Sequence, residues 1–196
     1  AMVALTVIGV LVGVAPEQPG ILVVLGGILV AIPACMLLAF GIEKIAYRPL
    51  RKAPRLAPLI TAIGVSIILQ NLAMLIWGRQ YVSFPEILPT TKFEFLGAHI
   101  SLLQISIVVL AFTIMAGLWL LVERTRLGRA MRATAQSKEV AELMGVNVDR
   151  VISATFIIGA AIAAIAGVMV SAYYGLAHYY MGFMLGLKAF SAAVLG

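Results

Sequence analysis

Three polar side chains lie close together in an apolar stretch at residues 56–77, and their chemistry is hydrogen bonding rather than bond breaking. Ser66 and Gln70 lie four residues apart, so a helix places them on one face, with Asn71 beside them. Amides within a bilayer need hydrogen-bonding partners, so these side chains should face protein or water rather than acyl chains. Two interpretations stay open: the side chains hold helices together, or they form part of a polar translocation path.

Lys188 is the only charged residue after Arg150, and it lies in the last apolar stretch. A lysine inside a membrane is a functional candidate, because placing its charge in lipid is costly. A lysine near a helix end can instead extend its ammonium group to the headgroups. We therefore keep both a place on the translocation path and an interfacial position as interpretations of Lys188.

Sequence motifs for catalysis and cofactor binding are missing. The chain has no G-x-x-x-x-G-K-[ST] phosphate loop, no H-E-x-x-H metal motif and no G-x-S-x-G nucleophile motif. Its two histidines, His99 and His178, are far apart. The net charge of +6 could suggest nucleic acid, but the basic residues cluster beside apolar runs, without a helix-turn-helix or zinc-finger pattern. We expect no enzyme activity, cofactor, metal or nucleic-acid partner for this chain.

The composition predicts an all-α, polytopic bundle of transmembrane helices. The sequence is 63% hydrophobic and only 11% charged, whereas soluble domains carry about 25% charged residues. We expect one transmembrane domain over residues 1–196 that is truncated at both ends, because both terminal apolar runs are shorter than a full span. The expected spans are residues 1–15 (the remainder of a helix), 21–42, 56–77, 100–122 and 151–173, with another span starting at 181–196.

The loop charges predict the orientation of these spans. Residues 43–55 carry five basic residues and one acidic residue, and residues 123–150 carry six basic residues. Positively charged loops stay in the cytoplasm, so both loops should be cytoplasmic and the chain should contact membrane lipid between them. Residues 78–99 then form an outer loop, which is either a connector or a docking surface for an external partner, and their "KFEF" alternates like a short strand.

Small residues recur at every fourth position in the fourth full span. This spacing lets two helix backbones approach closely, so it indicates helix packing more than a pore wall. The positions are Gly159, Ala163, Gly167 and Ser171.

The stretch "SKEVAELMG" in the second basic loop predicts a short amphipathic helix. Ser137 is a good N-cap, Glu139 suits the positive end of the helix dipole, and Gly145 stands where a left-handed residue ends a helix. The helix could lie on the membrane surface or insert into a groove of a soluble partner. Its apolar face consists of Val140, Leu143 and Met144.

Parts of this stretch and of its surroundings resemble a known family. Glu139, Ala141 and Gly145 resemble the E-A-A-x-x-x-G element of ABC importer permeases, although Val140 replaces an alanine and no I-x-L-P follows. The stretches "AYRPLRKAPRLAPLITAIGVSIILQNLAMLIWG" and "TRLGRAMRATAQSKEVAELMGVNVDRVISATFIIGAAIAAIAGVM" resemble branched-chain amino-acid permeases of the LivH type. So does "YYMGFMLGLKAFSAAVLG", and the resemblance begins at about residue 21.

The resemblance implies one permease subunit of an ATP-driven importer in a bacterial inner membrane. The implied partners are a second, LivM-like permease, two ABC ATPase subunits that bind the ATP, and an external or periplasmic solute-binding protein. Leucine, isoleucine and valine are the implied substrates, with urea, amides and other small solutes left open. A fragment of an ion-driven secondary transporter and a purely structural membrane subunit are the alternatives. In the implied coupling helix, the residues that would contact the ATPase are Glu139, Val140, Ala141, Leu143, Met144 and Gly145.

Overall fold

The computed structural model describes residues 21–52, 57–83, 92–95 and 98–195, and its architecture is a bundle of helices. Four described helices are long and apolar enough to cross a membrane. The expected helix at residues 1–15 and residues 84–91 and 96–97 of the outer loop lie outside the described residues. The helices are α2 (Ile21–Ile42), the π-helical turn η1 (Glu43–Tyr47), the 3-10 turn η2 (Pro49–Lys52), α3 (Ala57–Trp77), α4 (Leu102–Arg124), α5 (Arg126–Gln136), α6 (Lys138–Leu143), α7 (Val148–Tyr174) and α8 (Met181–Leu195).

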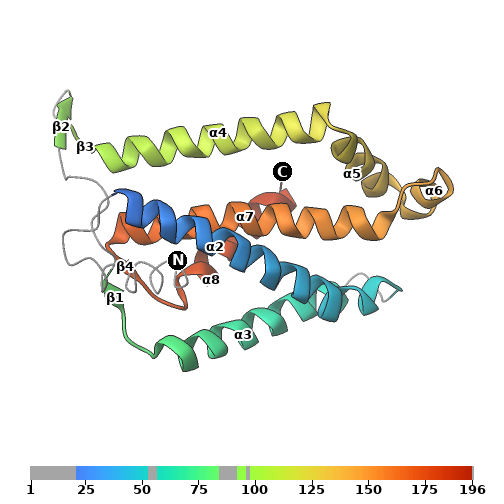
Figure 1. Cartoon of the computed structure of the whole chain (residues 1–196), viewed down its shortest axis with the longest axis horizontal. Coiled ribbons are helices and arrows are strands. Elements are labelled where there is room, and N and C mark those ends of the chain that lie inside the picture. Colours follow the sequence, from blue (N-terminus) through green and yellow to red (C-terminus); the bar gives the residue numbers. More distant parts are fainter. Residues whose placement is uncertain (1–20, 53–56, 84–91, 96–97, 196) are drawn as a thin grey trace.

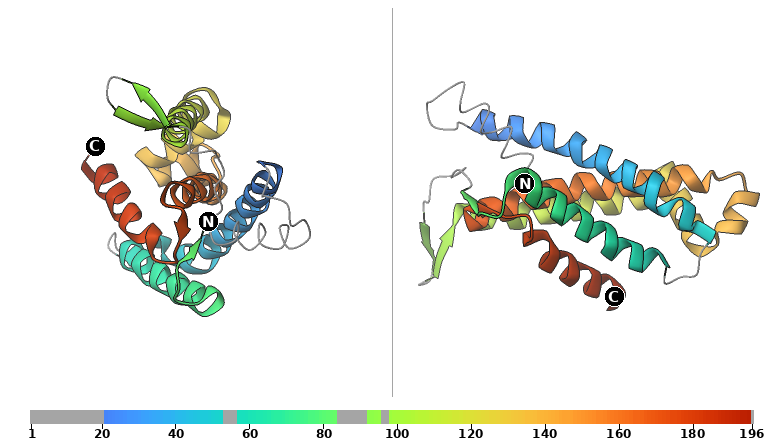
Figure 2. Two further views of the ribbon diagram at one scale, coloured as in Figure 1. Left: turned by 90° about the vertical axis from the view of Figure 1, so that its left-hand side faces the viewer. Right: turned by 90° about the horizontal axis from the view of Figure 1, so that it is seen from below.

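The helix α7 occupies the centre of the bundle. Seen along the bundle, α2, α3, α4 and α8 surround α7 (Figure 2). The helix α2 crosses α7 and makes the most extensive contact with it (Figure 1). The central helix therefore has protein neighbours on several sides, whereas the outer helices are covered on one side only.

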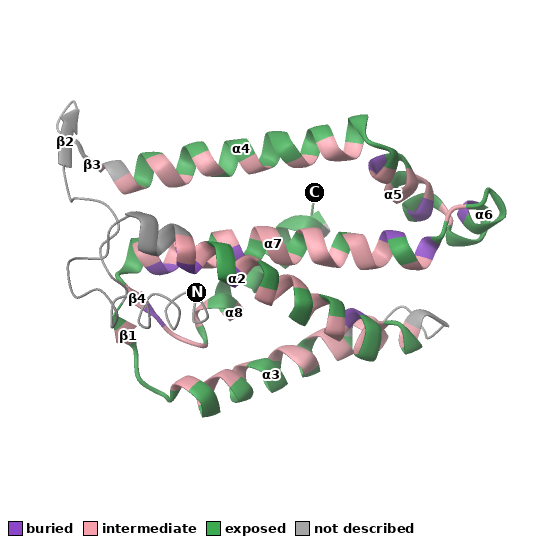
Figure 3. Ribbon diagram, in the orientation of Figure 1, coloured by how far each residue is buried: buried purple, intermediate pink, exposed green. Residues whose placement is uncertain are grey.

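The buried side chains at the centre are small. Ala31 is buried in α2, and Ala164, Val168 and Ser171 are buried in α7. Small residues allow helix backbones to approach closely, which is how helices associate where burial from water contributes little. Along their described lengths, α3 and α4 are coloured only as intermediate or exposed (Figure 3). Their apolar surfaces therefore need lipid or another protein chain to cover them.

Both basic loops lie at one end of the bundle, and short strands lie at the other end (Figure 1). At the strand end, β1 (Val82–Ser83) pairs with β4 (Leu176–Ala177), and β2 (Lys92–Phe95) pairs with β3 (Ala98–Ser101). The strand expected in "KFEF" is confirmed as β2. The long apolar run breaks where expected, because α7 ends at Gly175 in the left-handed conformation, with φ of +65°.

Candidate cytoplasmic docking helix and solute cavity

The short helix α6 starts at the residue expected from the sequence. The Ser137 hydroxyl accepts a hydrogen bond from the backbone N–H of Val140 at 3.4 Å, which confirms Ser137 as the N-cap. Glu139 lies in the first turn, where a carboxylate interacts favourably with the helix dipole. Helices of this length are unstable on their own, so the cap helps to keep α6 folded.

The end of α6 is fixed by a Schellman motif. Gly145 has φ of +82°, which confirms the left-handed residue expected there. The Val146 N–H donates to the Ala141 carbonyl at 2.9 Å, and the Gly145 N–H donates to the Glu142 carbonyl at 3.0 Å. These two hydrogen bonds satisfy carbonyls that the helix end would otherwise leave unpaired. The chain then turns directly into α7, whose N-cap is Asn147.

One side of α6 packs against the chain and the other side projects from it. Ala141 is only 2% exposed, so its small side chain anchors the helix. Leu143 and Met144 are 86% and 80% exposed, and Val140 is exposed as well. The apolar face expected from the sequence therefore lies on the surface of the chain. It projects at the same end as the basic loops (Figure 1).

The neighbouring helix α5 forms a corner with the end of α4. The Thr125 hydroxyl accepts from the Gly128 N–H at 3.0 Å, and Arg132 Nη1 contacts the Val122 carbonyl at 3.0 Å and Glu123 Oε2 at 3.1 Å. Gly128 lies so close to the Val122 carbonyl that a Cβ atom would overlap it. Sequence reasoning missed this corner, because its residues read as one continuous basic loop.

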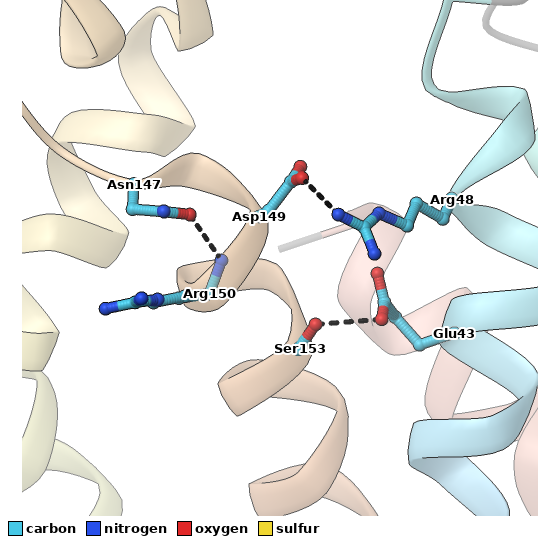
Figure 4. A network of polar contacts seen from close by, with 6 residues as sticks. All are labelled: Glu43, Arg48, Asn147, Asp149, Arg150 and Ser153. Atoms are coloured by element: carbon cyan, nitrogen blue, oxygen red, sulfur yellow. Dashed lines mark hydrogen bonds and ion pairs between the residues drawn. The ribbon is translucent and has the colours of Figure 1, made fainter.

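Two polar contacts join the start of α7 to the end of α2. Arg48 Nη2 lies 3.0 Å from Asp149 Oδ2, and the Ser153 hydroxyl donates to Glu43 Oε2 at 2.8 Å (Figure 4). Glu43 is only 2% exposed, whereas the Arg48 and Asp149 side chains are 53% and 48% exposed. Sequence reasoning missed both contacts. The available signal was that Glu43 is the one acidic residue of the first basic loop and directly follows an apolar run.

A cavity of about 540 Å³ lies between α2, α3, α7 and α8. Ser66 and Gln70 both line this cavity, and Gln70 Nε2 donates to Ser66 Oγ at 3.1 Å. The rest of the wall is mostly aliphatic, with Gly182 and Gly186 of α8 among its residues. Its aromatic lining residues are Tyr47, Phe156, Tyr179 and Phe183.

The other two candidates for the path do not line this cavity. Asn71 is exposed, and its Nδ2 donates to the Ile67 carbonyl of its own helix at 2.8 Å. Lys188 is exposed along α8 and is not among the lining residues either. The structure therefore brings Ser66 and Gln70 together at one cavity and places Asn71 and Lys188 elsewhere.

The stripe of small residues on α7 has mixed surroundings. Ser171 is buried and Gly167 is half-buried, but Gly159 and Ala163 are exposed. Among the described residues, the stripe therefore packs only at the end near Ser171. Packing of Gly159 and Ala163 against another chain stays a prediction.

A second cavity of about 420 Å³ lies between α4 and α7, with Leu185 of α8 also in its wall. Its lining is almost entirely aliphatic, with Gln104, Tyr173 and Tyr174 as the polar members. Such a surface suits hydrocarbon better than a small polar solute.

Four apolar spans, a partly polar cavity bounded by α2, α3, α7 and α8, and a capped helix displayed at the basic end define a polytopic helical membrane protein. The chain belongs to a family described as the permease component of the branched-chain amino acid transport system, whose sequence profile matches residues 1–196.

The chain is similar to several curated permeases. It is 43% identical over 181 residues to the high-affinity branched-chain amino acid transport system permease protein LivH of Escherichia coli, an alignment that covers 90% of this chain and 59% of that protein. It is 47% identical over 164 residues to BraD of Pseudomonas aeruginosa, a permease of the same description, covering 81% and 53%. The autoinducer 2 import system permease protein LsrD of Salmonella paratyphi B is 29% identical over 143 residues, covering 71% and 42%. The chain thus spans little more than half the length of LivH and BraD and less than half that of LsrD. No solved structure matches the chain.

Proposed function

We propose that this chain is the membrane-spanning part of a permease subunit in an ATP-driven importer of branched-chain amino acids, located in a bacterial inner membrane. The names of LivH and BraD, at 43% and 47% identity, support this substrate class over the autoinducer named for LsrD at 29%. Two ABC ATPase subunits, a LivM-like second permease and an external solute-binding protein complete the proposed assembly. Family membership favours this function over an ion-driven secondary transporter.

The single observation that supports an ATPase contact is that the apolar face of α6 is exposed at the surface of the chain. Exposed apolar side chains on a helix that is fixed at both ends are typical of a surface that binds a partner protein. Leu143 and Met144 would enter a groove on the ATPase, while Ala141 keeps α6 attached to the permease. Because α6 leads directly into α7, a movement of the ATPase would reach the membrane-spanning region through α7.

We further propose that the 540 Å³ cavity is part of the solute path. Its volume falls in the range of small-molecule sites, which is roughly 300–1,000 Å³. Its aliphatic walls suit the side chain of leucine, isoleucine or valine, and the Ser66 hydroxyl and Gln70 amide can hydrogen-bond the polar groups of an amino acid.

The test uses the full-length permease expressed with an ATPase subunit encoded beside it. Leu143→Asp should reduce recovery of the ATPase with the permease, because the apolar groove would have to desolvate a carboxylate. Lys138→Asp is the matched control, since it places the same side chain on an exposed position of α6 outside the apolar face. If Leu143→Asp retains normal ATPase binding and substrate-stimulated hydrolysis, α6 lies on the membrane surface instead and the docking proposal is wrong.

A further inference from the structure

An aromatic pair lies at the basic end of the solute cavity. Tyr47 and Phe156 both line the cavity, and their ring centroids are 5.0 Å apart at an angle of 50°. Tyr47 is the last residue of η1, and Phe156 lies about two turns into α7. Both elements begin at the end of the bundle that carries the basic loops (Figure 1). The pair therefore stands between the cavity and that end of the chain.

The turn that carries Tyr47 has an unusual backbone. The segment η1 is a π-helix in which the Arg48 N–H donates to the Glu43 carbonyl at 2.8 Å. Single π turns are rare, and they often mark functional positions because they can shift the residues that follow them. Here the π turn ends at Tyr47, which lines the cavity.

The two ends of this π turn are each tied to α7. At its start, Glu43 accepts the hydrogen bond from Ser153, and directly after its end, Arg48 pairs with Asp149 (Figure 4). These contacts flank Tyr47 on both sides. Together they keep the π turn against the first turns of α7, where Phe156 also lies.

The same contacts lie next to the docking helix. Asp149 is in the first turn of α7, and only five residues separate it from Leu143 of α6. Among the two contacts, the Arg48–Asp149 pair is the one nearer to α6 along the chain, so a displacement of α6 would reach it before the Ser153–Glu43 contact. Because both side chains are about half exposed, this ion pair contributes little to stability and can break and re-form during each transport cycle.

We propose that Tyr47 and Phe156 form the cytoplasmic closure of the solute cavity, and that Arg48, Asp149, Glu43 and Ser153 are positioning residues that hold this closure shut until α6 moves. This inference rests on the proposed function, because it takes the cavity as part of the solute path. The Ser153–Glu43 hydrogen bond is the more protected contact and acts as the fixed point of the turn. The Arg48–Asp149 pair is the contact that opens.

The experiment measures access to the cavity from the cytoplasmic side. The full-length permease, assembled with its partner subunits, carries Ser66→Cys as the reporter in a Cys35→Ser background, and inside-out vesicles are treated with an impermeant thiol reagent without ATP. Tyr47→Ala should speed the labelling of the reporter, and Tyr47→Phe should leave it slow because the ring remains. Tyr174→Ala is the matched control, since it removes an exposed tyrosine that does not line this cavity.

The ion pair is tested by neutralising one charge and then by exchanging the two charges. Asp149→Asn should raise the labelling rate roughly twofold to fivefold, the change expected from losing a half-exposed ion pair. The double variant Arg48→Asp with Asp149→Arg should restore slow labelling, which a merely destabilised protein would not do. Equal labelling rates in the unmodified protein, Tyr47→Ala and Asp149→Asn would overturn the closure. If Tyr47→Ala does not accumulate, the two surface variants alone decide the question.

The closure and the docking proposal fail in different ways. Faster labelling in Tyr47→Ala together with normal ATPase binding in Leu143→Asp supports the closure and contradicts α6 docking. Unchanged labelling together with lost ATPase binding in Leu143→Asp contradicts the closure and leaves the docking proposal standing.

Discussion

Substitutions at Gly145 should weaken the coupling between the permease and its ATPase to different degrees. The φ angle of +82° is one that side chains with a Cβ rarely adopt, and no atom lies within 4 Å of where that Cβ would be. The cost of a substitution is therefore backbone strain alone, with no steric clash added. For a non-glycine residue in the left-handed region this strain is about 1–2 kcal/mol, and it is smallest for asparagine and largest for β-branched residues.

This cost is large for such a short helix. If valine forces residue 145 out of the left-handed region, the hydrogen bonds from residues 145 and 146 to Glu142 and Ala141 are lost together. A change of 1–2 kcal/mol shifts a folded-to-unfolded ratio by roughly 5- to 30-fold. The helix α6 has six residues and depends on its caps, so a shift of this size is enough to leave its end mostly unwound.

The assay compares ATP-driven uptake in vesicles that contain the full-length permease and its partners. Gly145→Asn should transport nearly as well as the unmodified protein, Gly145→Ala less well, and Gly145→Val least, while all three insert into the membrane. Gly117→Val is the matched control, because Gly117 of α4 also has open space around its Cβ position but no left-handed φ. If Gly145→Val and Gly145→Asn transport equally well, the left-handed turn does not hold α6 in its coupling position.

Three further predictions concern orientation, the cavity and the α4–α5 corner. In a Cys35→Ser background, Lys138→Cys should resist an impermeant thiol reagent added outside intact cells and Ser83→Cys should react; outside labelling at residue 138 would reverse the orientation. Gly186→Val should reduce transport without loss of assembly, because Gly186 lines the cavity and a Cβ atom there meets no other described element within 4 Å. Transport at the rate of Gly64→Val, a position off the cavity wall, would argue against this path. Gly128→Ala should destabilise the corner by about 1–3 kcal/mol, because its Cβ would overlap backbone carbonyls; an unchanged thermal unfolding midpoint of the purified permease would contradict this packing.

The membrane helices and the caps of α6 could be read from the sequence because both are local features. In lipid a long apolar segment has to satisfy its backbone internally, so hydropathy alone locates the helix. The helix α2 covers the expected residues 21–42, and α3 covers the described part of the expected residues 56–77. Two helices start elsewhere than expected. The helix α4 begins at Leu102 rather than residue 100, because residues 100 and 101 belong to β3 and Ser101 is the N-cap. The helix α7 begins at Val148 rather than residue 151, because the Asn147 side chain accepts from the Arg150 N–H and extends the helix into the loop.

The contacts at the base of α7 could not be read from the sequence because they join distant segments. Ser153 and Glu43 are 110 residues apart, and Arg48 and Asp149 are 101 apart, so no local pattern relates them. The stripe on α7 shows a related difficulty. Four residues turn a helix by about 400°, so a four-residue repeat drifts by about 40° at each step and leaves the original face. The buried positions instead alternate spacings of four and three residues, at Ala164, Val168 and Ser171.

The distribution of buried residues also indicates which parts of the permease can move. Helices within a bilayer gain little from hiding apolar surface from each other, so close packing and polar contacts decide which of them stay together. Such contacts join α2 to α7, through small buried residues along their length and through Glu43 and Ser153 at the basic end. The described part of α3 contains no buried residue. Its end is tied to the end of α7 through the short β1–β4 pairing and through His178, which stacks on Tyr81 and contacts the Arg79 carbonyl.

The free-energy cost of changing the shape of the cavity is therefore lowest when α3 and α8 move while α2 and α7 stay packed together. The π turn follows α2 directly, and its backbone departs from regular α-helix. It lies between the docking helix and the cavity, and the contact that follows it is a half-exposed ion pair. The π turn is thus the segment best placed to respond to a movement of α6, and it also carries Tyr47. The proposed closure can therefore open while α2 and α7 stay packed against each other.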